Sequence, residues 1–151
     1  MFDLRDLYQQ VIVDHNKSPR NFGKLADFNH QADGYNPLCG DKLHIYLKVD
    51  DAGVIEDVSF EGEGCAISVA SASLMTDAMK GKSLDDFRTL FDGFQHMVTS
   101  DLAEAPDEEH MGKLAVLAGV REFPSRIKCA TLCWHTLHAA LQDSAEPAKT
   151  E

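Results

Sequence analysis

The sequence has 151 residues, of which 44% are hydrophobic and 26% charged, and its formal net charge is −11 at pH 7. Such a composition is typical of a globular domain with one core, and the negative charge with scattered basic residues argues against nucleic acid or an anionic membrane surface as a partner. No apolar run approaches the roughly 20 residues that span a bilayer, and the acidic N-terminal segment lacks the apolar region of a secretory signal, so we expect a cytoplasmic protein.

The N-terminal half is expected to form one helix followed by strands. Apolar residues recur at helical spacing in the first segment, and a proline and a glycine then end the helix. Farther on, Leu43, Ile45, Leu47 and Val49 alternate with His44 and other side chains of the opposite face, which predicts a half-buried strand. The predicted elements are a helix at residues 4–16, an edge strand at residues 24–36, and a hairpin with strands at residues 41–49 and 54–62.

The C-terminal half is expected to be helical. Ser83, with Asp86 three residues later, is a variant of the capping box that begins a helix. The acidic segment 101–110 is turn-like, and the polar tail 143–151 is predicted to be disordered. The predicted helices cover residues 65–80, 83–98, 110–120 and 126–142. We therefore expect a single domain at residues 1–142 of the α+β class, with a small antiparallel β-sheet packed against helices.

The cysteines are placed where the chain is predicted to change direction. Cytoplasmic cysteines are more often thiols, metal ligands or redox groups than structural disulfides. Cys39 lies in the loop NPLCGD, and Cys65 lies at the start of a predicted helix, where free backbone N–H groups and the helix dipole favour a thiolate. Cys129 follows Lys128 and lies one turn after Arg126, and these two cations also favour a thiolate.

An acid close to Cys39 adds a fourth candidate ligand. Three thiolate-prone cysteines, Cys39, Cys65 and Cys129, together with Asp41 indicate a tetrahedral zinc site of the Cys3Asp type. A carboxylate is a harder ligand than a thiolate for zinc, so Asp41 indicates a site that opens, exchanges ligands or accepts iron and sulfide. The alternative is that the cysteines are buried thiols that only pack.

A second cluster in the last helix is a poor candidate for a metal site. At about 100° per residue, Cys129 and Cys133 share one face, whereas His135 and His138 lie on the far side. We expect Cys133 to be a core residue and the two histidines to be solvated. The sequence also lacks the GxSxG motif of Ser/His/Asp hydrolases and the Lys-Ser/Thr of a phosphate-binding loop.

Three motifs in this order resemble those of the U-type iron–sulfur cluster assembly proteins, the family of IscU and the NifU N-terminal domain. The motifs are CGD with Cys39 and Asp41, GCAISVASAS with Cys65, and RIKCATLCW with Cys129, and the segment LYQQVIVDHNKSPRNFG is also similar to that family. The resemblance covers residues 4–142 and is closest to the SufU branch. Lys128 stands where IscU-type scaffolds carry a histidine ligand, EFPSRIK replaces their Leu-Pro-Pro-Val-Lys segment, and residues 92–112 resemble a SufU insertion.

The resemblance implies a SufE/NifU-like fold and a zinc ion held by Cys39, Asp41, Cys65 and Cys129. It implies a zinc-dependent sulfurtransferase in which Cys39 accepts persulfide sulfur from a SufS-type cysteine desulfurase. A histidine of the desulfurase would take over a zinc position and free Cys39. Downstream partners would be iron–sulfur assembly or acceptor proteins.

Further roles depend on the same resemblance. Arg126 and Lys128 would keep the thiols ionised or tune the cofactor site. Cys133 stands where a non-cysteine is usual in the family, which leaves open a second thiol that carries sulfur. The alternative function is a scaffold that assembles and transfers a [2Fe–2S] cluster on the same ligands. Lys128 in place of a histidine ligand favours sulfur transfer. A third alternative is a structural zinc domain that only docks partners.

Overall fold

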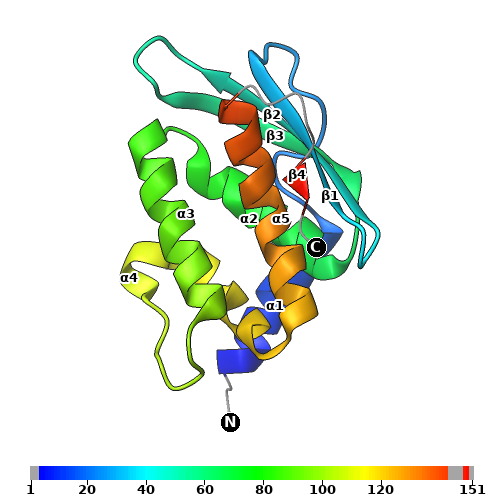
Figure 1. The fold of residues 1–151 in the computed structure, drawn as a ribbon, viewed down its shortest axis with the longest axis vertical. Coiled ribbons are helices and arrows are strands. Elements are labelled where there is room, and N and C mark those ends of the chain that lie inside the picture. Colours follow the sequence, from blue (N-terminus) through cyan, green and yellow to red (C-terminus); the bar gives the residue numbers. More distant parts are fainter. Residues whose placement is uncertain (1–3, 143–147, 150–151) are drawn as a thin grey trace.

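The computed structural model describes residues 4–142 and 148–149, which form a sheet with its helices gathered on one side (Figure 1). Within these residues the sheet has the strand order β3-β2-β1-β4. The elements are α1 (Leu4–Lys17), β1 (His30–Asn36), β2 (Asp41–Val49), β3 (Ile55–Glu63), α2 (Ala66–Met79), α3 (Leu84–Thr99), α4 (Glu108–Met111), the 3-10 helix η1 (Gly112–Glu122), α5 (Pro124–Leu141) and β4 (Ala148–Lys149). The expected α+β class, with an antiparallel sheet packed against helices, is confirmed.

The hairpin of β2 and β3 forms the centre of the sheet, as the alternating pattern predicts. Leu43, Ile45 and Leu47 are buried on the face that the helices cover. Tyr46 on the opposite face is also buried, because its ring packs 5.1 Å from that of Phe28 and its hydroxyl donates a hydrogen bond to the Glu61 carboxylate. The outer face is therefore covered locally by an aromatic pair.

Strand β1 differs from the predicted edge strand in length and in position. It begins only at His30 and pairs antiparallel with β2 on one side. On its other side, Ala148 and Lys149 form the short parallel strand β4. These two residues belong to the tail that is predicted to be disordered, and the second edge of β1 provides the hydrogen-bond partners for them. Residues 143–147 and 150–151 of the predicted tail lie outside the described residues.

Helix α5 lies directly on β1 and runs antiparallel to it. The close approach requires Gly34, because a Cβ there would lie 1.9 Å from Thr136 Oγ1. Asn36, at the end of β1, donates from Nδ2 to the sulfur of Cys129 near the start of α5. This register brings Cys129 to the end of the β1–β2 hairpin.

The segment between α3 and α5 is less regular than predicted. The short helix α4 at residues 108–111 covers the end of the predicted turn and the start of the predicted helix. Most of the predicted helix over residues 110–120 is instead a 3-10 helix at Gly112–Glu122, whose first residue, Gly112, has φ +55. That left-handed residue interrupts the α-helical hydrogen bonding after Met111. The buried residues of η1 still cover the core.

Among residues 4–142 and 148–149, none of the helices is both long and apolar enough to cross a bilayer.

Candidate metal centre

The loop NPLCGD connects β1 to β2 and presents Cys39. Asn36 and Asp41 are cross-strand partners that end the paired part of the hairpin, and four residues turn between them. The Cys39 N–H donates to the Asn36 carbonyl at 3.3 Å, and Gly40 adopts a left-handed conformation with φ +71. The turn leaves Cys39 exposed, so a partner molecule can reach its thiol.

Asp41 is the first residue of β2 and is only 1% exposed. Both of its carboxylate oxygens accept hydrogen bonds: Oδ1 from the Cys65 N–H at 2.8 Å and Oδ2 from Asn36 Nδ2 at 3.1 Å. A Cβ on Gly64 would lie 2.5 Å from Oδ1, so a side chain there would displace the carboxylate. These contacts compensate the burial of the acid and fix its orientation.

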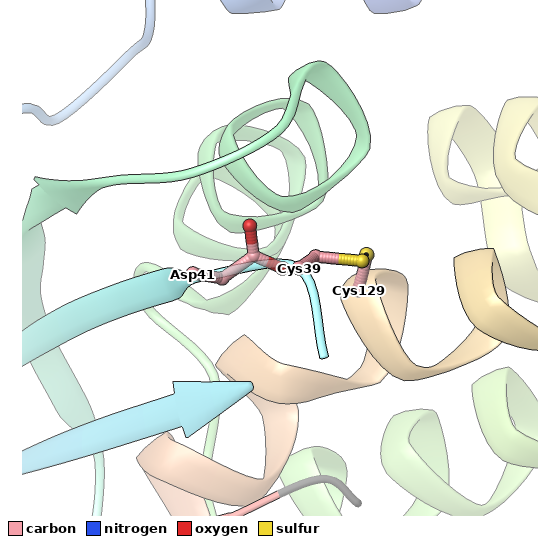
Figure 2. Close-up of side chains that lie close together, drawn as sticks. All are labelled: Cys39, Asp41 and Cys129. Atoms are coloured by element: carbon pink, nitrogen blue, oxygen red, sulfur yellow. Dashed lines mark hydrogen bonds between the residues drawn. The ribbon is translucent and has the colours of Figure 1, made fainter. Parts of the chain in front are cut away.

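Cys129 completes a group of three candidate ligands (Figure 2). Its sulfur lies 3.4 Å from the sulfur of Cys39. The ligand atoms of Cys39, Asp41 and Cys129 all lie within 4.8 Å of one another. Figure 2 shows the Cys39 and Cys129 side chains meeting at their sulfurs, one from the hairpin loop and the other from α5.

Cys65 is adjacent to this group but is not one of its three members. It occupies the N-cap position of α2 and is half-buried. Its backbone N–H holds Asp41, and its thiol interacts with that of Cys129. The structure therefore brings all four predicted ligands to one place, with three of them in the tighter group. The complete ligand set stays a prediction.

The local environment of Cys129 favours the neutral thiol. Burial raises the pKa of Cys129, and hydrogen bonds with the thiols of Cys39 and Cys65 raise it further. This is the opposite of the effect expected from Arg126 and Lys128. In the described part of the chain, neither cation makes a hydrogen bond or ion pair with a candidate ligand, and the Arg126 guanidinium instead stacks 4.3 Å from the centre of the Phe123 ring.

The donor set and its spacing fit one zinc ion. Thiolate and carboxylate are both zinc ligands, and a tetrahedron with Zn–S distances near 2.3 Å has ligand–ligand edges of about 3.8 Å. The distance of 3.4 Å between the Cys39 and Cys129 sulfurs is close to such an edge, and no two ligand atoms of the group of three are more than 4.8 Å apart. A cation at this point would also stabilise the deprotonated form of the buried Cys129 thiol.

An apolar groove of about 750 Å³ adjoins the thiols. Cys39, Cys65, Cys129 and Arg126 line one part of it. The apolar part of the lining comes from α1, α2, η1 and the residue before α5: Tyr8, Ile12, Ile67, Val116, Val120 and Phe123.

The rival cluster in α5 does not form a metal site in the structure. Cys133 is fully buried, as expected for a core residue, and its sulfur lies 3.4 Å from Ser71 Oγ. Burial raises its pKa to about 12. His135 and His138 are half-buried against the Phe91 ring rather than solvated as expected, because α3 packs over this face of α5. Burial lowers the pKa of His135.

Asn36 is a site residue that the sequence reasoning missed. Its amide contacts both Asp41 and Cys129. Its position at the start of NPLCGD, at the end of the predicted strand, could have indicated this role. A buried polar side chain usually has a specific hydrogen-bond partner.

The sequence matches the NifU-like N-terminal domain over residues 7–143. The chain belongs to this family. It is 46% identical over 135 residues to the zinc-dependent sulfurtransferase SufU of Bacillus subtilis, with 89% of each chain covered. It is 44% identical over 142 residues to the iron–sulfur cluster assembly scaffold protein IscU of Streptococcus pyogenes, covering 94% of this chain and 87% of that protein.

A solved structure agrees with this assignment. The SufU protein proposed as a scaffold for the SUF system of Fervidobacterium islandicum superposes with a TM-score of 0.80 and 32% identity. The match covers 92% of this chain and 99% of that one. The NifU-like fold expected from the motifs is therefore confirmed.

Proposed function

We propose that this chain works in iron–sulfur cluster assembly as a zinc-dependent acceptor and carrier of persulfide sulfur, with Cys39 as the acceptor. The observation that carries the proposal is the placement of Cys39, which is exposed in its loop while its sulfur lies 3.4 Å from the buried Cys129. One thiol is thus accessible to a partner and part of a metal-binding group. The names of the Bacillus and Streptococcus relatives support the same process.

Zinc would be held by Cys39, Asp41, Cys65 and Cys129. When bound, it supplies positive charge that stabilises the deprotonated thiols. Asp41 enters the site with both oxygens already held by Cys65 and Asn36. Arg126 and Lys128 are proposed to add positive potential around the thiols, and Arg126 does so from the wall of the groove.

The proposed transfer is a thiol–persulfide exchange. The Cys39 thiolate attacks the outer sulfur of a cysteine persulfide on the partner. The S–S bond of that persulfide breaks as a new S–S bond forms on Cys39, and the partner's cysteine leaves as a thiolate. No external oxidant or reductant is needed, because one S–S bond replaces another.

The proposed donor is a SufS-type cysteine desulfurase in the cytoplasm. The groove next to Cys39 offers the apolar surface that a protein partner needs to dock beside the thiol. Later iron–sulfur assembly or acceptor proteins would take the sulfur from Cys39.

A second candidate function is a scaffold for a [2Fe–2S] cluster. The same observation of clustered thiols supports it, because cysteine thiolates are the usual ligands of such clusters. The Streptococcus relative carries a scaffold name. Sulfur transfer is favoured because Lys128 occupies the position before Cys129, where a neutral histidine ligand would serve a cluster better.

The deciding experiment is cysteine desulfurase turnover with and without the zinc-loaded protein. We expect strong stimulation and one added sulfur atom on Cys39, detected by mass spectrometry of peptides. The Cys39→Ser variant should stay folded and abolish both effects, and Cys133→Ser serves as the matched control with both retained. Absence of stimulation by folded, zinc-loaded protein would rule out sulfur transfer, and a cluster on anaerobically purified protein would then support the scaffold. Unfolding of Cys39→Ser would favour a structural zinc domain.

A further inference from the structure

Asn36 lies at the junction of the three clustered ligands and has 0% exposure. It is the last residue of β1, and its cross-strand partner is Asp41. Side chains of such a pair point to the same face of the sheet, and here that face is covered by α5. The position places the amide between a ligand from β2 and a ligand from α5.

The Asn36 side chain donates to both neighbouring ligands. Nδ2 lies 3.1 Å from Asp41 Oδ2 and 3.4 Å from Cys129 Sγ. The backbone carbonyl of the same residue accepts the Cys39 N–H at 3.3 Å. Asn36 is therefore hydrogen-bonded to each member of the group of three.

The orientation of the amide follows from these contacts. The carboxylate and the sulfur are both acceptors in the charged state, so the NH2 group and not the carbonyl oxygen must face them. The remaining oxygen, Oδ1, is buried and has no hydrogen-bond partner among the described residues. A buried acceptor without a partner destabilises the fold, so folding stability alone does not explain an asparagine here.

We propose that Asn36 is a positioning residue for the metal centre. Its NH2 group holds Asp41 Oδ2 and Cys129 Sγ, while the Cys65 N–H holds Asp41 Oδ1. The carboxylate and the thiolate are thereby oriented before the metal arrives, and their remaining lone pairs are left for it. This inference rests on the proposed metal site and assigns to it a residue that does not itself bind the ion.

The test compares Asn36→Asp with wild type in the full chain. The substitution keeps the shape of the side chain and replaces the donor NH2 by an acceptor oxygen. Asn29→Asp makes the same chemical change at an exposed site whose amide holds only the Val49 backbone, so it is the matched control. Asn36→Ser removes the amide without adding charge, and it replaces Asn36→Asp if that variant does not fold.

Two measurements are made on protein that is folded without metal, as judged by circular dichroism. The first is the zinc dissociation constant from competition with a chromophoric chelator, and the second is the visible absorption spectrum of the cobalt(II)-substituted protein. We expect zinc affinity to fall roughly 10- to 100-fold, the usual effect of losing an outer-shell partner, with altered cobalt bands. Asn29→Asp should match wild type in both.

The outcomes separate this inference from the proposed function. Wild-type zinc affinity and an unchanged cobalt spectrum in a folded Asn36 variant would overturn the positioning role alone. Failure of the wild-type protein to bind either metal would overturn the metal centre itself.

Discussion

At the scale of single residues, the position of the Asp41 carboxylate depends on a neighbour without a side chain. Gly64 precedes Cys65 at the junction of β3 and α2. A Cβ at residue 64 would lie 2.5 Å from Asp41 Oδ1 and 3.0 Å from Cγ. Because Asp41 is also held by Asn36, it has little freedom to move away.

Gly64→Ala is therefore expected to weaken zinc binding by about tenfold or more, in the range found when the support of a ligand is lost. The measurement is the zinc dissociation constant by chelator competition. Gly119→Ala is the control, because a Cβ there meets no atom within 4 Å. Equal affinities in the two variants would show that the carboxylate adapts and that its fixed position is unimportant for the metal.

The predicted ligands Cys39, Asp41 and Cys129 could be named from the sequence because each carries chemistry that packing does not require. Asn36 could not, because its role depends on how α5 lies across β1. Its amide reaches Cys129 only through the close approach at Gly34. Such a contact between distant segments leaves no local pattern in the chain.

At the scale of elements, the strands and helices that could be predicted are those that a local residue pattern determines. The hairpin strands follow from the alternation at Leu43, Ile45 and Leu47, and the start of α3 follows from Ser83. The two-residue strand β4 is fixed only by pairing with β1. Segment η1 has the apolar residues expected of a helix, but the local pattern does not reveal the positive φ of Gly112, which interrupts the α-helical hydrogen bonding at its start.

The capping box of α3 offers a test at this scale. Ser83 Oγ accepts the Asp86 N–H at 3.1 Å, and the Asp86 carboxylate accepts the Ser83 N–H at 3.3 Å. Ser83→Ala should lower the free energy of unfolding by about 1 kcal/mol, the usual value of an N-cap. Urea unfolding of metal-free protein measures this change.

Zinc affinity should not change in Ser83→Ala, because the cap makes no contact with the thiols. Asp86→Ala and the double variant complete a cycle that isolates the reciprocal bond. A Ser83→Ala protein as stable as wild type would mean that the cap bonds contribute nothing measurable to the fold.

At the scale of the whole molecule, two histidines make stability depend on pH. Burial lowers the pKa of His15, with a further contribution from Arg20, and burial also lowers the pKa of His135. His15 joins α1 to α2: Ser73 Oγ accepts the Arg20 N–H at 2.8 Å and is hydrogen-bonded to His15 Nδ1 at 2.7 Å.

The sign of the effect follows from proton linkage. Each histidine binds fewer protons in the folded than in the unfolded state, where its pKa is about 6.5. Their contribution is present above about pH 6.5 and is lost as the pH falls below it toward the lowered folded-state pKa values. Urea unfolding of metal-free protein should therefore give a smaller free energy at pH 5.5 than at pH 7.5.

His15→Gln should reduce this pH dependence, because it removes one of the two histidines whose pKa burial lowers. Stability that is equal at the two pH values in the wild-type protein would contradict the linkage.

The proposed metal site joins parts of the chain that are far apart in sequence, and its effect on stability is a property of the whole fold. Cys39 lies in the hairpin loop, Asp41 in β2, Cys65 at the start of α2 and Cys129 in α5. An ion bound by all four stabilises only the folded chain, by about 2.7 kcal/mol when free zinc is 100 times its dissociation constant. For a domain of this size, with roughly 2–4 °C per kcal/mol, the melting temperature should rise by about 5–11 °C. Calorimetry of zinc-loaded protein before and after chelation measures this shift in melting temperature. The shift should be much smaller in Asp41→Ala. A wild-type melting temperature that chelation does not change would mean that the metal does not stabilise the folded chain.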